Sequence, residues 1–114
     1  MKLNKEKVIS AIQKVDGLIE SDYCSGGKYC AIGACLVCIG WKDRLYELSD
    51  TIDNNREAVV DLTDRFGGTE RDWCVIQDHN DDFEPDDYDE DYHNYEIKRK
   101  ESVIQFIKDM PEAE

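Results

Sequence analysis

Apolar residues near the start of the chain recur three or four positions apart, which is the spacing of a helix with one buried face. Asn4 is a candidate N-cap for this helix, which we expect from about Lys5 to Val15, with an extension past Gly17 left open. The stretch Ser21–Lys28 contains Ser-Gly-Gly and is expected to form a loop.

The next segment, Tyr29–Trp41, is apolar on every side, which is typical of a helix at the centre of a small domain. A buried strand over Leu36–Ile39 is the competing interpretation, and the length of the segment favours the helix. Its small residues would let a neighbouring backbone approach closely; they are Ala31, Gly33 and Ala34.

Three further helices complete the expected fold. A short one covers Asp43–Leu48, and a second begins near a cap at Asp50 or Thr51 and ends at Gly67-Gly68. Thr69 and Asp72 resemble a capping box and open a helix that carries Trp73 and Ile76.

The final helix runs from about Tyr95 to Lys108, and no hairpin signal is present. The sequence therefore predicts a single all-α domain, residues 1–114, with about five helices around Tyr29–Trp41.

Charge changes the picture of the surface. The chain has 114 residues, 14 Lys and Arg and 27 Asp and Glu, for a net charge of −13. This balance argues against direct binding to nucleic acid or to an anionic membrane, and favours a basic protein partner or a cation. No signal peptide and no membrane-spanning stretch is apparent, so a cytoplasmic location is expected.

The excess charge is concentrated in one segment, Asp78–Tyr92, which has nine acidic residues and no Lys or Arg. Without it the chain has 27 − 9 = 18 acids against 14 bases, a net charge of −4. We expect either a solvated acidic loop or a recognition surface in which carboxylates imitate nucleic-acid phosphates. The expected partner-binding residues are Asp82, Glu84, Asp86, Asp87, Tyr88, Asp89, Glu90, Asp91 and Tyr92.

A calcium site is a further interpretation of the same segment. The first alternating ligand positions of an EF-hand loop are matched by Asp78, Asn80, Asp82 and Glu84. Phe83 stands where the loop needs glycine, and Asp89 takes the place of the usual bidentate Glu. The sequence therefore predicts no resident metal and no other cofactor, and a divalent-cation-binding module stays as an alternative function.

Five cysteines, an odd number in a chain expected to be cytosolic, predict free thiols. The spacing of Cys24, Cys30, Cys35 and Cys38 suits a zinc site poorly. Core packing is the favoured role for Cys35, Cys38 and Cys74.

Cys30 is the candidate for chemistry. It lies at the expected start of the buried helix and near Lys28, a setting that would lower the pKa of its thiol. A small thiol enzyme would also need a base, for which His79 and His93 are the candidates. This alternative to a non-enzymatic protein stays open.

Three stretches taken together carry a family resemblance. Residues Tyr29–Leu36 read Tyr-Cys-Ala-Ile-Gly-Ala-Cys-Leu, Val75–Asp81 ends in Asn-Asp, and Val103–Ile107 is a later apolar stretch. The combination resembles a family of small bacterial and phage proteins of unknown function, in which a Tyr-Cys-Ala-hydrophobic-Gly-Ala helix precedes an Asn-Asp turn and a final amphipathic helix.

The resemblance implies an all-α fold and a bacterial or phage origin, and it brings no activity. It also implies that Asn80 caps a helix or bonds the backbone at the Asn-Asp turn. This chain departs from the family in a long acidic insert, Asp82–Tyr92. The leading hypothesis is therefore a non-enzymatic interaction protein, in its most concrete form a phage-type inhibitor of a host nucleic-acid-binding or defence protein.

Overall fold

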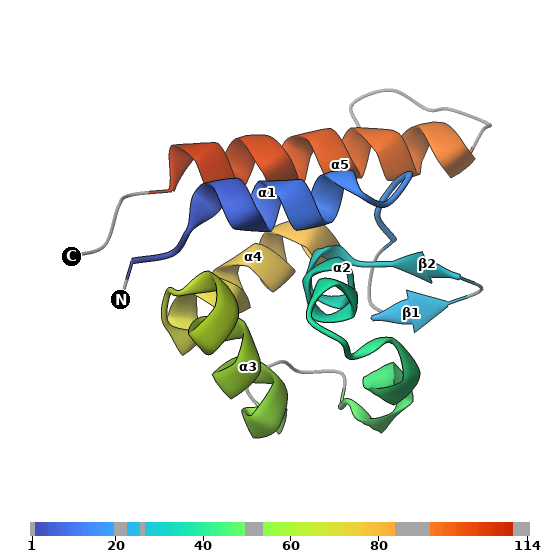
Figure 1. Ribbon diagram of the computed structural model, residues 1–114. Coiled ribbons are helices and arrows are strands. Elements are labelled where there is room, and N and C mark those ends of the chain that lie inside the picture. The colour runs from blue at the N-terminus through green and yellow to red at the C-terminus, as the bar shows by residue number, and fades with distance from the viewer. Residues whose placement is uncertain (1, 20–22, 26, 50–53, 84–91, 111–114) are drawn as a thin grey trace.

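A computed structural model describes residues 2–19, 23–25, 27–49, 54–83 and 92–110 (Figure 1). In chain order the elements are α1 (Lys5–Gln13), β1 (Cys24–Ser25), β2 (Lys28–Tyr29), α2 (Ala31–Cys38), the 3-10 helix η1 (Lys42–Glu47), α3 (Arg56–Phe66), α4 (Glu70–Asp82) and α5 (Tyr92–Asp109). The all-α class is confirmed, since the described strands are two residues long.

The apolar helix lies at the centre of the fold, as expected. α2 contacts α1, α3, α4 and η1, and its residues Ala31–Leu36 are all buried. It is shorter than the predicted Tyr29–Trp41 because Tyr29 belongs to β2 and Gly40 leaves the helix with φ +100°. A Cβ on Gly33 would lie 2.0 Å from the carbonyl oxygen of Tyr23, so the expected close backbone approach is confirmed there.

α1 and α5 lie side by side and run in opposite directions, and the two chain ends lie on the same side of the molecule (Figure 1). Asn4 caps α1 by accepting a hydrogen bond from the Lys7 amide at 3.1 Å. α1 ends at Gln13 instead of Val15. The Lys100 ammonium donates to the carbonyl oxygens of Val15 (2.7 Å) and Gln13 (3.4 Å), which fastens this end to α5.

The α3–α4 corner follows the predicted signals closely. Gly67 ends α3 with φ +81°, and Thr69 and Asp72 form the capping box that begins α4. The rings of Phe66 and Trp73 pack edge to face with centroids 5.7 Å apart. The predicted caps Asp50 and Thr51 lie outside the described residues, and α3 itself begins at Arg56.

Both helices that flank the acidic segment are longer than predicted. α4 continues to Asp82 and α5 starts at Tyr92, so residues 78–82 and Tyr92 are helical and the insert between the helices is shorter than Asp78–Tyr92. The cause is the buried face of α4, which continues at helical spacing through Trp73, Ile76, Gln77 and Asn80. Burial of that face outweighs the repulsion among the carboxylates in the last turn.

A small hairpin contradicts the expectation of none. β1 pairs antiparallel with β2, with Cys24 opposite Tyr29 and Ser25 opposite Lys28. Gly27 in the turn has φ +81°, a conformation that glycine adopts without a steric cost. The strands are too short for an alternating pattern to reveal them.

Candidate functional site

The acidic segment is described only at its ends. Asp82 is the last residue of α4 and is exposed, and Tyr92 is the first residue of α5. The other expected partner-binding residues lie outside the described residues; they are Glu84, Asp86, Asp87, Tyr88, Asp89, Glu90 and Asp91.

Arg99 on α5 fixes the point from which the acidic segment leaves α4. Its buried guanidinium donates to the carbonyl oxygens of Asn80 (3.0 Å), Leu18 (3.3 Å) and Phe83 (3.4 Å). It also lies 5.5 Å from the centroid of the Phe83 ring. A cation at a helix C-terminus satisfies carbonyls that have no partner within the helix. The start of the segment is therefore attached to the core at α4 and α5.

Asn80 is a second buried polar link in the same region. Its Oδ1 accepts from the Ala31 amide at 3.1 Å, and its Nδ2 donates to the Ile19 carbonyl at 2.9 Å. The side chain is fully buried. The implied backbone-bonding role of Asn80 is thus confirmed, while the implied turn is wrong, because Asn80 and Asp81 belong to the last turns of α4.

Cys30 is a buried helix cap. Its Sγ accepts from the Gly33 amide at 3.4 Å, and burial raises the pKa of its thiol to about 12. The expected lowering of this pKa is therefore wrong. The nearby cation is also engaged elsewhere, because Lys28 Nζ lies 2.9 Å from a carboxylate oxygen of Glu96.

His79, one of the two candidate bases, does not join Cys30 in the described structure. His79 Nε2 lies 2.9 Å from Ser102 Oγ, and the His79 ring packs on Phe106 with centroids 4.3 Å apart. The side chain of His93 lies outside the described part. Cys30 and His79 share no hydrogen bond, and each one bonds a different element.

The other cysteines divide by exposure. Cys35 is buried as expected, and burial raises the pKa of its thiol, whereas Cys74 is half-buried. Cys38 is exposed at the end of α2, so its predicted core position is wrong; Lys14 Nζ lies 3.7 Å from its Sγ. Among the described residues, no group of three or more His, Cys, Asp or Glu side chains is arranged to hold a metal ion.

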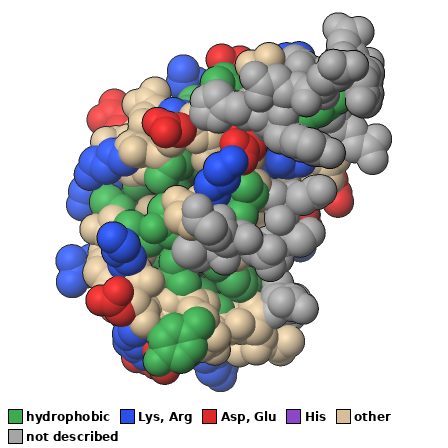
Figure 2. All heavy atoms as spheres, turned by 90° about the vertical axis from the view of Figure 1, so that its right-hand side faces the viewer, with side chains coloured by type: hydrophobic (Ala, Val, Ile, Leu, Met, Phe, Trp, Pro, Cys, Tyr) green, Lys and Arg blue, Asp and Glu red, His purple; other side chains and the backbone are tan. Residues whose placement is uncertain are grey.

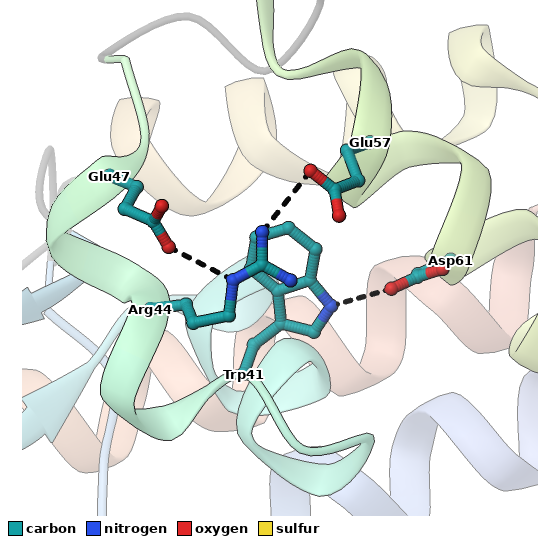
Figure 3. Close-up of polar contacts among 5 residues, drawn as sticks. All are labelled: Trp41, Arg44, Glu47, Glu57 and Asp61. Carbon is teal, nitrogen blue, oxygen red and sulfur yellow. Dashed lines mark hydrogen bonds and ion pairs between the residues drawn. The ribbon is translucent and has the colours of Figure 1, made fainter.

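A polar cluster on the surface joins η1 to α3 (Figure 3). The Trp41 indole donates to an Asp61 carboxylate oxygen at 2.8 Å, and the Arg44 guanidinium lies 4.2 Å from the Trp41 ring centroid. Arg44 also pairs with Glu47 at 2.9 Å and Glu57 at 3.1 Å, which raises the pKa of its guanidinium. Every charged residue of the cluster has a partner within the chain, so the role of the cluster is to hold η1 against α3.

A groove between α4 and α5 has a volume of about 820 Å³. We call it the α4–α5 groove. Its lining residues are Arg71, Asp72, Val75, His79, Ser102, Gln105, Phe106, Asp109 and Met110. Sequence reasoning missed this feature, because the two walls come from segments about 30 residues apart and only the packing of the helices brings them together.

On the face shown in Figure 2, the described Lys and Arg side chains are interspersed with acidic and hydrophobic ones and form no single basic patch. Within the described part of the chain, no helix has both the length and the apolar character needed to span a bilayer.

Comparison of the chain with protein-family models, with curated proteins and with solved structures gives no match. The resemblance to the small bacterial and phage family stays a prediction.

Proposed function

We propose that this protein is a non-enzymatic interaction protein that uses the carboxylates of residues Asp82–Tyr92 to bind a basic surface on another protein. The observation that carries the proposal is the concentration of charge: nine acidic residues and no Lys or Arg lie within residues 78–92, in a chain whose remainder has a net charge of only −4. Complementary charge of this density accelerates association and selects basic partners.

The attachment of the segment supports the proposal. Arg99 holds the end of α4, and Tyr92 begins α5, so the segment joins two packed helices and is not a free tail. An attached segment loses less conformational entropy on binding than a free tail does.

Basic protein surfaces commonly serve to bind nucleic acid, because Lys and Arg neutralise phosphates. We therefore extend the proposal to a mechanism in which the carboxylates displace nucleic acid from a host nucleic-acid-binding or defence protein. The cytoplasm of a bacterial host is the proposed place of action. Two observations favour this proposal over the thiol enzyme: Cys30 is buried, and its hydrogen bond is with Gly33 while that of His79 is with Ser102.

A pair of charge-matched variants tests the proposal. The segment variant carries the amide at five positions: Asp86→Asn, Asp87→Asn, Asp89→Asn, Glu90→Gln and Asp91→Asn. The body variant carries the same number of amides at exposed acids outside the segment: Glu6→Gln, Asp16→Asn, Asp43→Asn, Asp64→Asn and Glu101→Gln. Both variants have the same net charge.

Each protein is immobilised and exposed to bacterial lysate at low and at moderate salt, and the retained proteins are identified by mass spectrometry. We expect the wild type and the body variant to retain the same basic protein, the segment variant to lose it, and added DNA or RNA to compete. Circular dichroism checks that both variants remain helical. Equal retention by the two variants would contradict the proposal, because binding would then depend on net charge or on another surface.

A further inference from the structure

The α4–α5 groove has an apolar floor between two charged ends. Val75 and Phe106 are half-buried there, and Met110 closes the floor near the end of α5. The stacked rings of His79 and Phe106 lie toward one end, next to Ser102. The helices run antiparallel along the groove, so the start of α4 and the end of α5 form its other end.

The dimensions of the groove suit a helix. One wall extends over nine residues of α4, from Arg71 to His79, and the other over nine residues from Ser102 on α5 to Met110, directly after α5. At 1.5 Å per residue each wall is about 12 Å long. Anchoring side chains at positions i, i+4 and i+7 of a docked helix span about 10 Å, which matches this length.

Charge identifies the kind of helix. Of the described residues that line the groove, Asp72 and Asp109 are acidic and Arg71 alone is a Lys or Arg. Beyond the lining residues, the exposed carboxylates Asp78 and Asp82 continue along α4, and Lys98 lies one turn before Ser102 on α5. With these included, acidic side chains outnumber Lys and Arg by four to two along the two helix faces. The protein as a whole has a net charge of −13. An apolar helix face that enters this groove therefore meets a predominantly acidic border, which Lys and Arg on its flanks would complement.

We propose that the α4–α5 groove binds the apolar face of a basic amphipathic helix that belongs to the partner protein. The proposal rests on the proposed function, because it takes from it the basic character of the partner. It adds a second, apolar contact surface on the helices that flank the acidic segment.

Three synthetic helical peptides of about 15 residues, near the shortest length at which isolated helices form, serve as probes. The first carries Leu at three anchor positions spaced i, i+4 and i+7, with Lys on the flanks. The second keeps every Lys and replaces each Leu with Ser, and the third keeps every Leu and replaces each Lys with Glu. Fluorescence anisotropy measures the affinity of each peptide at one fixed salt concentration.

We expect the Leu/Lys peptide to bind at least about tenfold more tightly than the Ser/Lys peptide, because burying a single Leu side chain contributes enough for such a ratio. The Leu/Glu peptide should bind far more weakly than the Leu/Lys peptide. Equal affinities of the Leu/Lys and Ser/Lys peptides would refute binding of an apolar helix face in the groove. Equal affinities of the Leu/Lys and Leu/Glu peptides would refute the proposal that the bound helix is basic.

A matched pair of variants places the binding on the protein. Val75→Lys puts a cation in the floor of the groove, and Val60→Lys makes the same change on α3, where Val60 is 53% exposed. We expect Val75→Lys to weaken Leu/Lys binding by about tenfold or more and Val60→Lys to change it by less than about twofold. Equal effects of the two variants would overturn the proposal.

Two further readouts separate the alternatives. Gln105→Trp fills the groove from an exposed position without removing a core side chain, and it should reproduce the loss if Val75→Lys unfolds the protein. Analytical ultracentrifugation tests whether a second copy of this chain occupies the groove. A wild-type dimer that Val75→Lys converts to a monomer would refute the proposal of a partner helix. Failure of the proposed function can be told apart from failure of the groove proposal. In the first case the segment variant would still retain the protein from the lysate, independently of the peptide affinities.

Discussion

The buried amide of Asn80 is expected to contribute more to stability than any exposed polar side chain of the protein. We consider Asn80→Leu, which keeps a side chain of similar size and removes both polar groups. Three hydrogen bonds are lost: one to the neighbouring Asp81 carboxylate, and two with backbone groups, from the Ala31 amide and to the Ile19 carbonyl. The Ala31 amide is in the first turn of α2, where the helix itself supplies no acceptor.

The expected cost follows from these two backbone groups. A buried donor or acceptor left without a partner costs about 1–3 kcal/mol. The Ala31 amide is buried, and the bond to the Ile19 carbonyl is partly buried, so Asn80→Leu should lower the free energy of unfolding by about 2–5 kcal/mol. A total stability of about 5–15 kcal/mol is usual for a small domain, so the loss would be large.

Urea unfolding, followed by the fluorescence of Trp41 and Trp73 and by circular dichroism, measures the change. Asn4→Ala is the control, because Asn4 is an exposed asparagine with one capping bond, to the Lys7 amide, and its loss should cost about 1 kcal/mol. The reasoning is refuted if Asn80→Leu lowers stability by no more than Asn4→Ala does.

Three other predictions concern α2 and its cysteines. When the native protein is treated with a thiol-alkylating reagent, the exposed Cys38 should react first, and the buried Cys30 and Cys35 should react only on unfolding. Peptide mass spectrometry follows the labelling, and Cys30 labelled as fast as Cys38 would contradict the prediction. Folding raises the pKa of Cys30 from about 9 to about 12, so the buried neutral thiol contributes its full stability below pH 9, and this contribution is lost as the pH rises to 12. Urea titrations over this range should show the free energy of unfolding fall by up to about 4 kcal/mol, and Cys30→Ala should reduce that fall. Gly33→Ala should lower the free energy of unfolding, measured by urea, by about 1–3 kcal/mol, because the added Cβ would lie 2.0 Å from the Tyr23 carbonyl oxygen. An unchanged urea midpoint would contradict this and show that the two backbone segments can move apart there.

Local signals in the sequence were sufficient for most of the helical framework. The capping box of Thr69 and Asp72, the glycine end of α3 and the wholly apolar character of α2 each act within a few residues. The same local reasoning failed at the end of α4, where the count of acidic residues predicted a loop. The buried positions Gln77 and Asn80 continue the helical spacing, but they are polar, and their partners lie on other elements.

The candidate site depended on long-range packing and was harder to predict. Cys38 is exposed on the central helix α2, whereas its apolar neighbourhood in the sequence gave the opposite expectation. Arg99 carried only the signal of a Lys-Arg-Lys run, which is typical of a solvated face, yet its guanidinium is buried against three carbonyl oxygens. Neither the groove nor this buried arginine has a signature within one stretch of chain.

The two proposed contact surfaces would act on different steps of binding. The carboxylates of residues Asp82–Tyr92 would act at a distance, so their removal should slow association and reduce its dependence on salt. The apolar floor of the α4–α5 groove acts only at contact, so Val75→Lys should chiefly accelerate dissociation. Arg99 and Asn80 connect the two surfaces structurally, because both fix the last turn of α4 to the core. The direction in which a partner helix enters the groove would therefore be set by the same buried bonds that fix the start of the acidic segment.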